Sequence, residues 1–339
     1  MRGCLGGLVL VLVLGAGAGC RVLPARPPAP PPSGPVVRVG YIANGVAAGL
    51  GFVLEEGGLL ASQRLAVSFQ RYGGPEGMRR ALAANDLDVA LGLPVLTAAR
   101  LMEEDVPVRV VAAVQRADEQ VVVLANSPLQ QLRELRGRAV GTVGAGSQGD
   151  LLLRTVLSAS YGIAPSEVRL STGTETQLVA QLESGTLEAA VLRGLTIDGL
   201  PERSRYRLLG DLGTEWQAAT GSPAPPLVGT VTLRRGFREG YPEAAARVLA
   251  AVVLAVRWGR EHPSEVAQLM MRNLRMTESN AQNYARRWSA VWEARMDEAV
   301  VAGFLSQLES LRAQGLLRDP PSPALFDPSL WPQALALVD

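Results

Sequence analysis

The chain has no lysine, one histidine and two cysteines, and each shortage excludes a class of chemistry. A pyridoxal phosphate Schiff base and a phosphate-binding P-loop both need a lysine amine, so neither is compatible with this sequence. Cys4 and Cys20 lie near the N-terminus, which leaves the folded part without a thiol for a disulfide, a nucleophile or a metal site. His262 stands in a polar turn, GREHPSEV, typical of a solvated loop. Metal or acid–base chemistry that uses only Asp and Glu stays possible, but no paired-carboxylate motif at helical spacing stands out, so we expect no catalytic residue, no cofactor and no metal.

An excess of charge is also lacking. The 33 basic residues, all of them arginine, nearly balance 32 acidic residues and leave a net charge of +1. This balance disfavours a nucleic acid or an acidic membrane surface as the partner. About 300 residues follow the N-terminal segment, which is enough for two domains that each have a core.

The N-terminus has the pattern of an export signal. Arg2 precedes an unbroken Leu/Val run over residues 8–14, and small residues lead to Cys20. The apolar run is shorter than the roughly 20 residues of a membrane span. Small residues ending at a cysteine resemble the lipobox of bacterial lipoproteins, in which the cysteine is acylated. We predict a signal over residues 1–20 with lipid on Cys20; simple cleavage and an uncleaved anchor are the alternatives.

Residues 24–35, PARPPAPPPSGP, have too much proline to form a core and favour an extended polyproline conformation. We predict that residues 21–35 are a tether that holds the folded part away from a membrane. A disordered leader with no spacing role is the alternative.

The folded part contains an internal repeat with an offset of about 100 residues. Residues 72–94, YGGPEGMRRALAANDLDVALGLP, align with residues 172–194, TGTETQLVAQLESGTLEAAVLRG. Each copy alternates strands and helices, with strands predicted at residues 37–42, 65–71, 138–143 and 168–171. This alternation predicts parallel sheets covered by helices on both faces, in two lobes of the α/β class.

After Val228 the pattern changes from alternating elements to helices. LVGTVTLRRGF predicts a returning strand, and helices are predicted over residues 241–259, 263–273, 277–292 and 297–314. Because these helices have no sheet of their own, we expect them to complete the first lobe. The predicted boundaries are residues 36–117 and 228–339 for lobe 1 and 118–227 for lobe 2.

A G-x-G-x-x-G pattern at Gly144, Gly146 and Gly149 lies between a predicted strand and a predicted helix. In a dinucleotide site an acidic residue about 20 positions later ends the second strand and holds the ribose, but here that strand ends in VRLSTGT, with no carboxylate until Glu175, past the turn. The turn more naturally offers the backbone N–H groups of Ser147, Gln148 and Gly149 to an anion at a helix N-terminus. A purely structural turn and a nucleotide site remain alternatives.

The order and spacing of these segments resemble the substrate-binding proteins of ABC importers, in the branch for nitrate, sulfonates, taurine or thiamine-pyrimidine precursors. The resemblance rests on VRVGYI, GMRRALAANDLDVALG, LRELRGRAVGTVGAGSQGDLLLRTVL and LVAQLESGTLEAAVL, and it covers about residues 36–330. It implies two Rossmann-like lobes around a central cleft, the periplasmic-binding-protein type 2 fold, with a discontinuous first lobe. It also implies an exported monomer that is anchored by its lipid or periplasmic and passes a small solute to a permease and an ATPase.

Loops at the carboxyl ends of the strands of both lobes would line that cleft. A guanidinium matches a carboxylate, sulfonate or phosphate, so Arg193 is a candidate for an anionic ligand, although a salt bridge with Glu175 or Asp198 would occupy it equally well. Trp216 and Tyr72 are candidates for stacking on an organic ligand, whereas Trp258, Trp288 and Trp292 fit core positions. The predicted ligand-binding residues are Asn44, Gly73, Gly74, Gly92, Gln115, Arg116, Ser147, Gln148, Gly149, Thr172, Thr174 and Arg193.

Two other functions fit the same scaffold. Enzymes of pyrimidine-precursor synthesis and of menaquinone pathways resemble it, although they work inside the cell and the first needs a lysine-linked cofactor. A ligand-sensing protein outside the membrane is also compatible with the sequence. We therefore expect a binding protein without catalysis and keep the enzyme and the sensor as alternatives.

Overall fold

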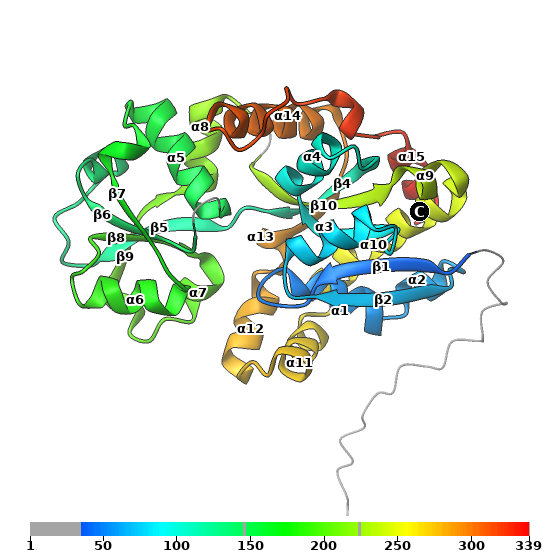
Figure 1. Cartoon of the computed structure of the whole chain (residues 1–339). Coiled ribbons are helices and arrows are strands. Elements are labelled where there is room, and N and C mark those ends of the chain that lie inside the picture. Colours follow the sequence, from blue (N-terminus) through cyan, green and yellow to red (C-terminus); the bar gives the residue numbers. More distant parts are fainter. Residues whose placement is uncertain (1–34, 145–146, 223–224, 339) are drawn as a thin grey trace, which may run out of the picture.

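The computed structural model describes residues 35–144, 147–222 and 225–338 (Figure 1). Cys20, the predicted signal and all of the predicted tether except Pro35 lie outside these ranges. The described residues form two lobes, each with its own β-sheet. Within those residues, no helix has both the length and the apolar character needed to cross a membrane.

Lobe 1 is built on a six-stranded sheet in the order β11-β4-β10-β3-β1-β2. Strand β1 runs parallel to β2 and β3, whereas β10 lies antiparallel between β3 and β4. Because β10 and β11 come from the part of the chain that follows lobe 2, lobe 1 is discontinuous, as predicted. Its strands are β1 (Val37–Ile42), β2 (Val67–Tyr72), β3 (Val89–Pro94), β4 (Val108–Arg116), β10 (Leu227–Arg234) and β11 (Trp292–Arg295).

Lobe 2 is built on a five-stranded sheet in the order β7-β6-β8-β5-β9. Strand β6 is parallel to β7 and β8, and β5 is antiparallel to β8 and β9. The strands are β5 (Glu119–Leu124), β6 (Ala139–Thr142), β7 (Arg169–Thr172), β8 (Ala189–Arg193) and β9 (Tyr206–Asp211).

Both sheets are therefore mixed, and the expectation of parallel sheets is wrong in this respect. A parallel neighbour requires a crossover connection, usually a helix. Strands β5 and β10 instead enter their sheets directly from the segments that cross between the lobes, and they run antiparallel. A second difference is β11, because residue 292 was expected to end a helix and no strand was predicted at residues 293–295. Trp292 instead pairs with Gln115 of β4 at the edge of the sheet.

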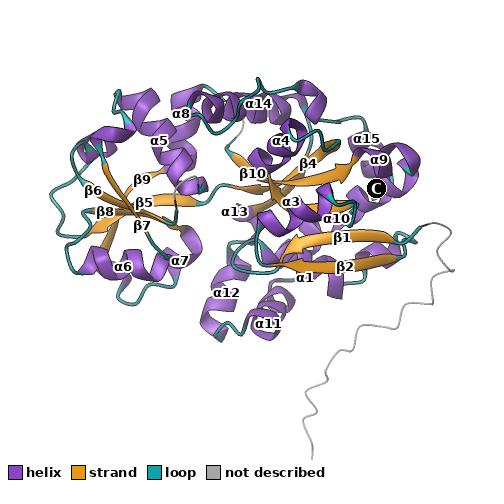
Figure 2. Cartoon of the chain, viewed as in Figure 1, coloured by secondary structure: helices purple, strands orange, loops and turns teal. Residues whose placement is uncertain are grey.

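Helices cover both faces of each sheet (Figure 2). In lobe 1, buried residues of α1, α10, α11 and α12 form one core, and those of α3, α4 and α14 form the other. In lobe 2, α5 and α8 cover one face and α6 and α7 the other. The helices are α1 (Ala48–Glu56), α2 (Leu59–Ser62), α3 (Pro75–Ala83), α4 (Val95–Glu103), α5 (Gln148–Tyr161), α6 (Glu175–Glu183), α7 (Gly194–Asp198), α8 (Leu212–Thr220), α9 (Arg235–Gly240), α10 (Pro242–Glu261), α11 (Pro263–Leu274), α12 (Glu278–Arg286), α13 (Trp288–Val291), α14 (Glu298–Ala313) and α15 (Leu330–Leu335).

The predicted repeat has a counterpart in the contacts of the two lobes. Asp88 accepts a hydrogen bond of 2.9 Å from the backbone N–H of Arg38 at the start of β1. Glu188, its partner in the repeat, accepts one of 3.0 Å from the N–H of Ala139 at the start of β6. The same acidic position therefore fixes the neighbouring strand in each lobe.

Two segments cross between the lobes and lie side by side. One joins β4 to β5 and the other leads from α8 to β10. The N–H of Ala117 in the first segment donates to the carbonyl of Pro226 in the second, at 2.8 Å. This double connection is the place where a relative movement of the lobes would bend the chain.

Candidate ligand-binding cleft

A cavity of about 180 Å³ lies where lobe 2 faces lobe 1. It is formed by the start of β5, the turn after β6, the start of α5, and the carboxyl end of β8 with the neighbouring start of α6. Its lining residues are Glu119, Val143, Ser147, Gln148, Gly149, Glu175, Val191 and Arg193. Four of the twelve residues predicted from the sequence, namely Ser147, Gln148, Gly149 and Arg193, are therefore brought together here.

The start of α5 comes close to the floor of this cavity because residue 149 has no side chain. A Cβ at Gly149 would lie 2.7 Å from Cγ1 of Val191 and 3.4 Å from Cγ of Glu119. Ser147 caps the helix, its hydroxyl accepting from the N–H of Asp150 at 3.4 Å. The N–H of Ser147 donates to the carbonyl of Gly144 at 3.0 Å, so of the three N–H groups predicted to bind an anion only those of Gln148 and Gly149 remain available to a ligand. Gly146 lies outside the described residues.

Gln148 adds a further unused donor. Its Nε2 atom is buried and has no hydrogen-bond partner among the described residues. Unpaired buried donors are rare in native proteins, because each costs free energy comparable to a lost hydrogen bond. This amide is therefore a candidate to bind a ligand acceptor.

Arg193 enters the cavity already paired. Its backbone N–H, Nε and Nη2 donate to the Glu175 carboxylate at 2.9, 3.1 and 2.8 Å, and Thr196 donates to the same carboxylate at 2.8 Å. Burial raises the pKa of Glu175, but hydrogen bonds and charge from Arg193 outweigh burial and hold that pKa below its ordinary value. Of the two roles expected for Arg193, the structure shows the salt bridge with Glu175.

Glu119 is the cavity residue that sequence reasoning missed. Its Oε2 accepts from the N–H of Asp118 at 2.9 Å, and no ion pair is formed by its carboxylate among the described residues. Burial raises the pKa of Glu119 to about 7, against smaller opposing effects of the Asp118 N–H and the Arg193 charge. The available signal was its place directly after the crossing segment, at the start of a buried strand.

Lobe 1 contributes the turn after β1 to the opposite side. A Cβ at Gly45 would lie 3.4 Å from Nη1 of Arg193, so this turn approaches the guanidinium across the lobe boundary. Asn44 donates from its amide to the carbonyl of Gly73 at 2.6 Å and ties together two of the predicted loops. Gly92, within β3, has a φ of +73°, which favours glycine.

Three of the predicted residues have local partners. The Arg116 guanidinium is paired with Glu293 of β11, and the side chain of Gln115 packs beside Gly229 of β10. Thr174 caps α6 through the N–H of Gln177 at 3.3 Å. The remaining positions, Gly74 before α3 and Thr172 at the end of β7, are outside the set that lines the cavity.

The aromatic residues divide between core and surface. The interpretation of Trp216 as a stacking residue is wrong, because it is 2% exposed and packs in the core of lobe 2. Trp288 and Trp292 are buried in lobe 1, as expected. His262 joins α10 to α11 and stacks on Trp258, with ring centroids 4.6 Å apart. The hydroxyl of Tyr72 donates to Gln70, and its ring packs against the lobe 1 core.

Two sets of contacts join the lobes outside the cavity. On one side Arg287, between α12 and α13, pairs with Asp118 of the crossing segment and with Asp198 of α7, the latter at 2.9 Å. Gly194 must be small there, because its Cβ would meet Nη2 of Arg287. Asn283 also donates to the carbonyl of Asp198 at 3.3 Å.

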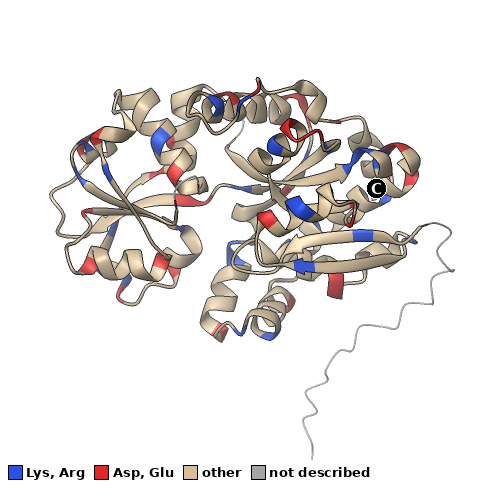
Figure 3. Ribbon diagram, in the orientation of Figure 1, with Lys and Arg blue, Asp and Glu red and all other residues tan. Residues whose placement is uncertain are grey.

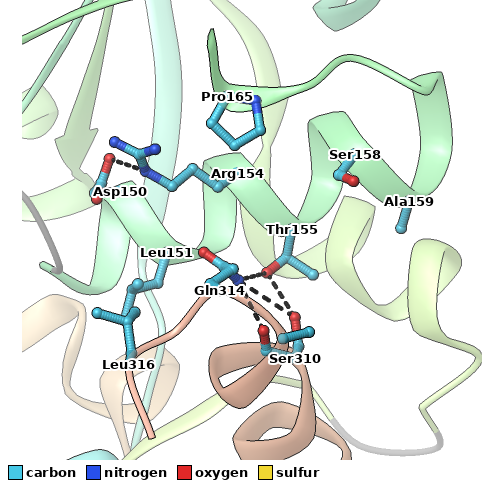
Figure 4. Close-up of a pocket in the computed structure, with 11 residues that line it drawn as sticks. Asp150, Leu151, Arg154, Thr155, Ser158, Ala159, Pro165, Ser310, Gln314 and Leu316 are labelled. Atoms are coloured by element: carbon cyan, nitrogen blue, oxygen red, sulfur yellow. Dashed lines mark hydrogen bonds and ion pairs between the residues drawn. The ribbon is translucent and has the colours of Figure 1, made fainter.

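On the other side α5 lies against α14, with a groove of about 530 Å³ between them (Figure 4). Thr155 and Ser310 are hydrogen-bonded at 3.1 Å, and the amide of Gln314 donates to Thr155 at 3.3 Å. Leu151 of α5 is buried in a core of lobe 1. Contacts on both sides of the cavity therefore hold the lobes in the arrangement seen.

Acidic and basic positions are interspersed over both lobes (Figure 3). Among the described residues, no group of three or more His, Cys, Asp or Glu side chains is placed to hold a metal ion. The chemistry at the cleft is therefore that of two carboxylates, one guanidinium, one amide and a helix N-terminus.

A family model described as menaquinone biosynthesis matches residues 60–306, well over half of the chain. The chain belongs to this family. Comparison with curated proteins gave no match.

Solved structures with the same architecture include sulfonate-binding and nitrate-binding proteins. The periplasmic aliphatic sulphonate binding protein SsuA from Escherichia coli is 17% identical with a TM-score of 0.72, over 85% of this chain and 95% of that one. The periplasmic nitrate-binding protein NrtA from Synechocystis PCC 6803 is 15% identical with a TM-score of 0.64, over 91% and 90%. The alkanesulfonate-binding protein SsuA from Xanthomonas axonopodis pv. citri, bound to MOPS, is 16% identical with a TM-score of 0.64, over 90% and 99%. At these identities the comparison shows the fold, which is the two-lobed fold of periplasmic binding proteins.

Proposed function

We propose that this chain is an extracytoplasmic solute-binding protein that holds a small polar organic solute between its lobes. The solute would then pass to the permease of an ABC importer. The observation that carries the proposal is the cavity beside Glu119 and Arg193, at the boundary where Gly45 of lobe 1 faces lobe 2. The residues that line the cavity all belong to lobe 2, and a ligand that also reached the turn at Gly45 would contact both lobes, which is the condition for a ligand to favour closure.

The chemistry of the cavity supports binding of a polar solute. Donors are available at the start of α5 and on Nε2 of Gln148, and acceptors are available on the Glu119 carboxylate. Val143, which is 45% exposed, and Val191 supply an apolar surface. A few directed polar groups on an apolar background are typical of small-molecule sites.

The sulfonate-binding and nitrate-binding proteins of the same fold provide the first compounds to test. Native mass spectrometry of gently purified protein should reveal a co-purified solute, and the identified solute should raise the melting temperature. The solute should be recovered unchanged after prolonged incubation. Steady conversion of that solute into a product would contradict the binding function.

Export and anchoring belong to the same proposal. The pattern before Cys20 supports acylation of this residue and attachment to the outside of the membrane. In a bacterial host, the wild-type chain should partition with membranes, and Cys20→Ser should shift it to the soluble fraction. Mass spectrometry of the mature N-terminus should find the lipid on Cys20. Equal partitioning of both forms would contradict the anchor.

An enzyme is the second candidate, and the family description favours it. The cavity could support acid–base chemistry, because Glu119 has a pKa of about 7 and the ionised Glu175 lies beside Arg193. Intermediates of menaquinone biosynthesis should then be turned over by the purified protein, with a rate that falls at least tenfold in Glu119→Gln. Absence of turnover together with tight binding of a solute would favour the binding function.

A further inference from the structure

The cavity contains two carboxylates and one guanidinium, and only one carboxylate is neutralised. Arg193 and Glu175 form an ion pair with contacts of 2.8 to 3.1 Å, so their charges cancel within the site. Glu119 lines the same cavity and lacks an ion-pair partner among the described residues. The local charge is therefore negative when Glu119 is ionised and close to zero when it is protonated.

Neighbouring charged groups do not supply the missing cation. Asp118 lies next to Glu119 and pairs with Arg287 from lobe 1. On α5, Asp150 is paired with Arg154 at 2.8 Å. At the end of β9, Asp211 accepts from the amide of Gln120 at 3.3 Å. The described cations near Glu119 are Arg287, Arg154 and Arg193, and each of them already pairs with another carboxylate.

Glu119 is also held in place. The start of α5 packs against its Cγ, with Gly149 leaving just enough room, and its Oε2 is fixed by the N–H of Asp118. A positioned carboxylate in a partly water-excluded cavity interacts more strongly with an opposite charge than it would in water. This geometry provides a preformed receptor for a cation or a strong hydrogen-bond donor.

We propose that Glu119 determines the class of solute, which presents an ammonium group to this carboxylate. The inference rests on the proposed binding function. Val143 and Val191 would contact the carbon part of the solute, and its remaining polar group would face Gln148 and the start of α5. An ammonium accepted here completes an ion pair that the protein itself lacks.

The proposal has a definite pH dependence. Burial raises the pKa of Glu119 to about 7, so the carboxylate is mostly protonated at pH 6 and mostly ionised at pH 8. An ammonium ligand favours the ionised form, so its affinity rises between pH 6 and pH 8 and binding releases a proton. A ligand that bears only negative charge would take up a proton and bind more weakly as the pH rises.

Two matched pairs of probes test this preference. Taurine and isethionate both end in a sulfonate, and β-alanine and 3-hydroxypropionate both end in a carboxylate. In each pair the first compound has an ammonium group where the second has a hydroxyl. Calorimetry at pH 6 and pH 8 should give at least tenfold tighter binding for the ammonium member at pH 8, the size of a charge-assisted contact. Glu119→Gln should abolish the preference, whereas Glu261→Gln, an exposed position on α10, should retain it.

The other possible results of these measurements also decide for or against the proposal. Tighter binding of the hydroxyl members, or the same preference in Glu119→Gln, would overturn the proposal while leaving solute binding intact. If none of the four probes binds, the carboxyl resonance assigned by comparison with Glu119→Gln gives the answer without a ligand. A titration midpoint near 7 supports an unpaired carboxyl, and a midpoint near the ordinary glutamate value overturns the proposal. Failure of the binding function would appear separately, as the absence of any co-purified or stabilising solute.

Discussion

At the scale of single residues, Glu119 links the cleft to the stability of the fold. Its ordinary pKa is 4.5, and burial raises it to about 7 in the folded chain. Between these values the folded state keeps a proton that the unfolded chain has lost, so stability falls as the pH rises through this window. The free energy of unfolding of Glu119→Gln should therefore rise by about 1 to 3 kcal/mol relative to that of the wild type when the pH is raised from 5 to 8. Urea unfolding at both pH values measures this, with Glu261→Gln expected to show no such gain.

The pair of Arg193 and Glu175 makes a second prediction at this scale. Arg193→Ala leaves a mostly buried carboxylate without its partner and should lower the free energy of unfolding by about 1 to 2 kcal/mol, since the guanidinium itself is partly exposed. The double variant Arg193→Ala/Glu175→Gln should recover part of this loss, because no buried carboxylate is then left without a partner at residue 175. Denaturant unfolding of the two variants would refute this explanation if the double variant were the less stable.

At the scale of elements, the lack of a side chain at Gly149 explains how α5 reaches the cleft. Gly149→Ala would place a methyl group 2.7 Å from Val191 and should destabilise the protein by about 1 to 3 kcal/mol through displacement of the helix start. Gly144→Ala is the matched control, because no atom lies within 4 Å of its Cβ position. Thermal unfolding of both variants compares them. Equal stability would show that close packing is not what residue 149 requires.

The element scale also shows the limit of the sequence patterns. The strand starts were predicted within about two residues for β1, β2, β6 and β7, because alternation and turn residues are local signals. The direction of β5 and β10 and the existence of β11 were missed. Pairing partners depend on which edge of a sheet is free after the rest has folded, and that is a long-range property.

At the scale of the whole molecule, Arg287 forms ion pairs that join the two lobes. It contacts the crossing segment through Asp118 and lobe 2 through Asp198. Burial raises the pKa of Asp118, and the Arg287 charge opposes this, so the pair is present around neutral pH and weakens on acidification. Removing the guanidinium should shift the balance of lobe arrangements toward the open form by roughly tenfold.

Small-angle X-ray scattering should find a larger radius of gyration for Arg287→Ala than for the wild type. Arg260→Ala is the matched control, since it removes an exposed arginine of α10. An unchanged radius for Arg287→Ala would place the resistance to opening in the contacts between α5 and α14 instead.

The sequence by itself determined the two-lobed α/β fold, the discontinuous first lobe and the absence of lysine and usable thiol chemistry from the folded part. These follow from composition, from the repeat and from local periodicity, which every stretch of chain carries on its own. It also placed Ser147, Gln148, Gly149 and Arg193 at strand ends that meet in one cavity.

The tertiary structure alone decided which charges in the cleft are already satisfied. Arg193 was predicted equally well as a ligand residue or as the partner of Glu175, and the contact distances settle its present partner. Glu119, Trp216 and Arg287 gained their roles only from burial and from neighbours distant in sequence. Electrostatic balance depends on distances between separate elements, and those distances exist only once the two lobes have been packed together.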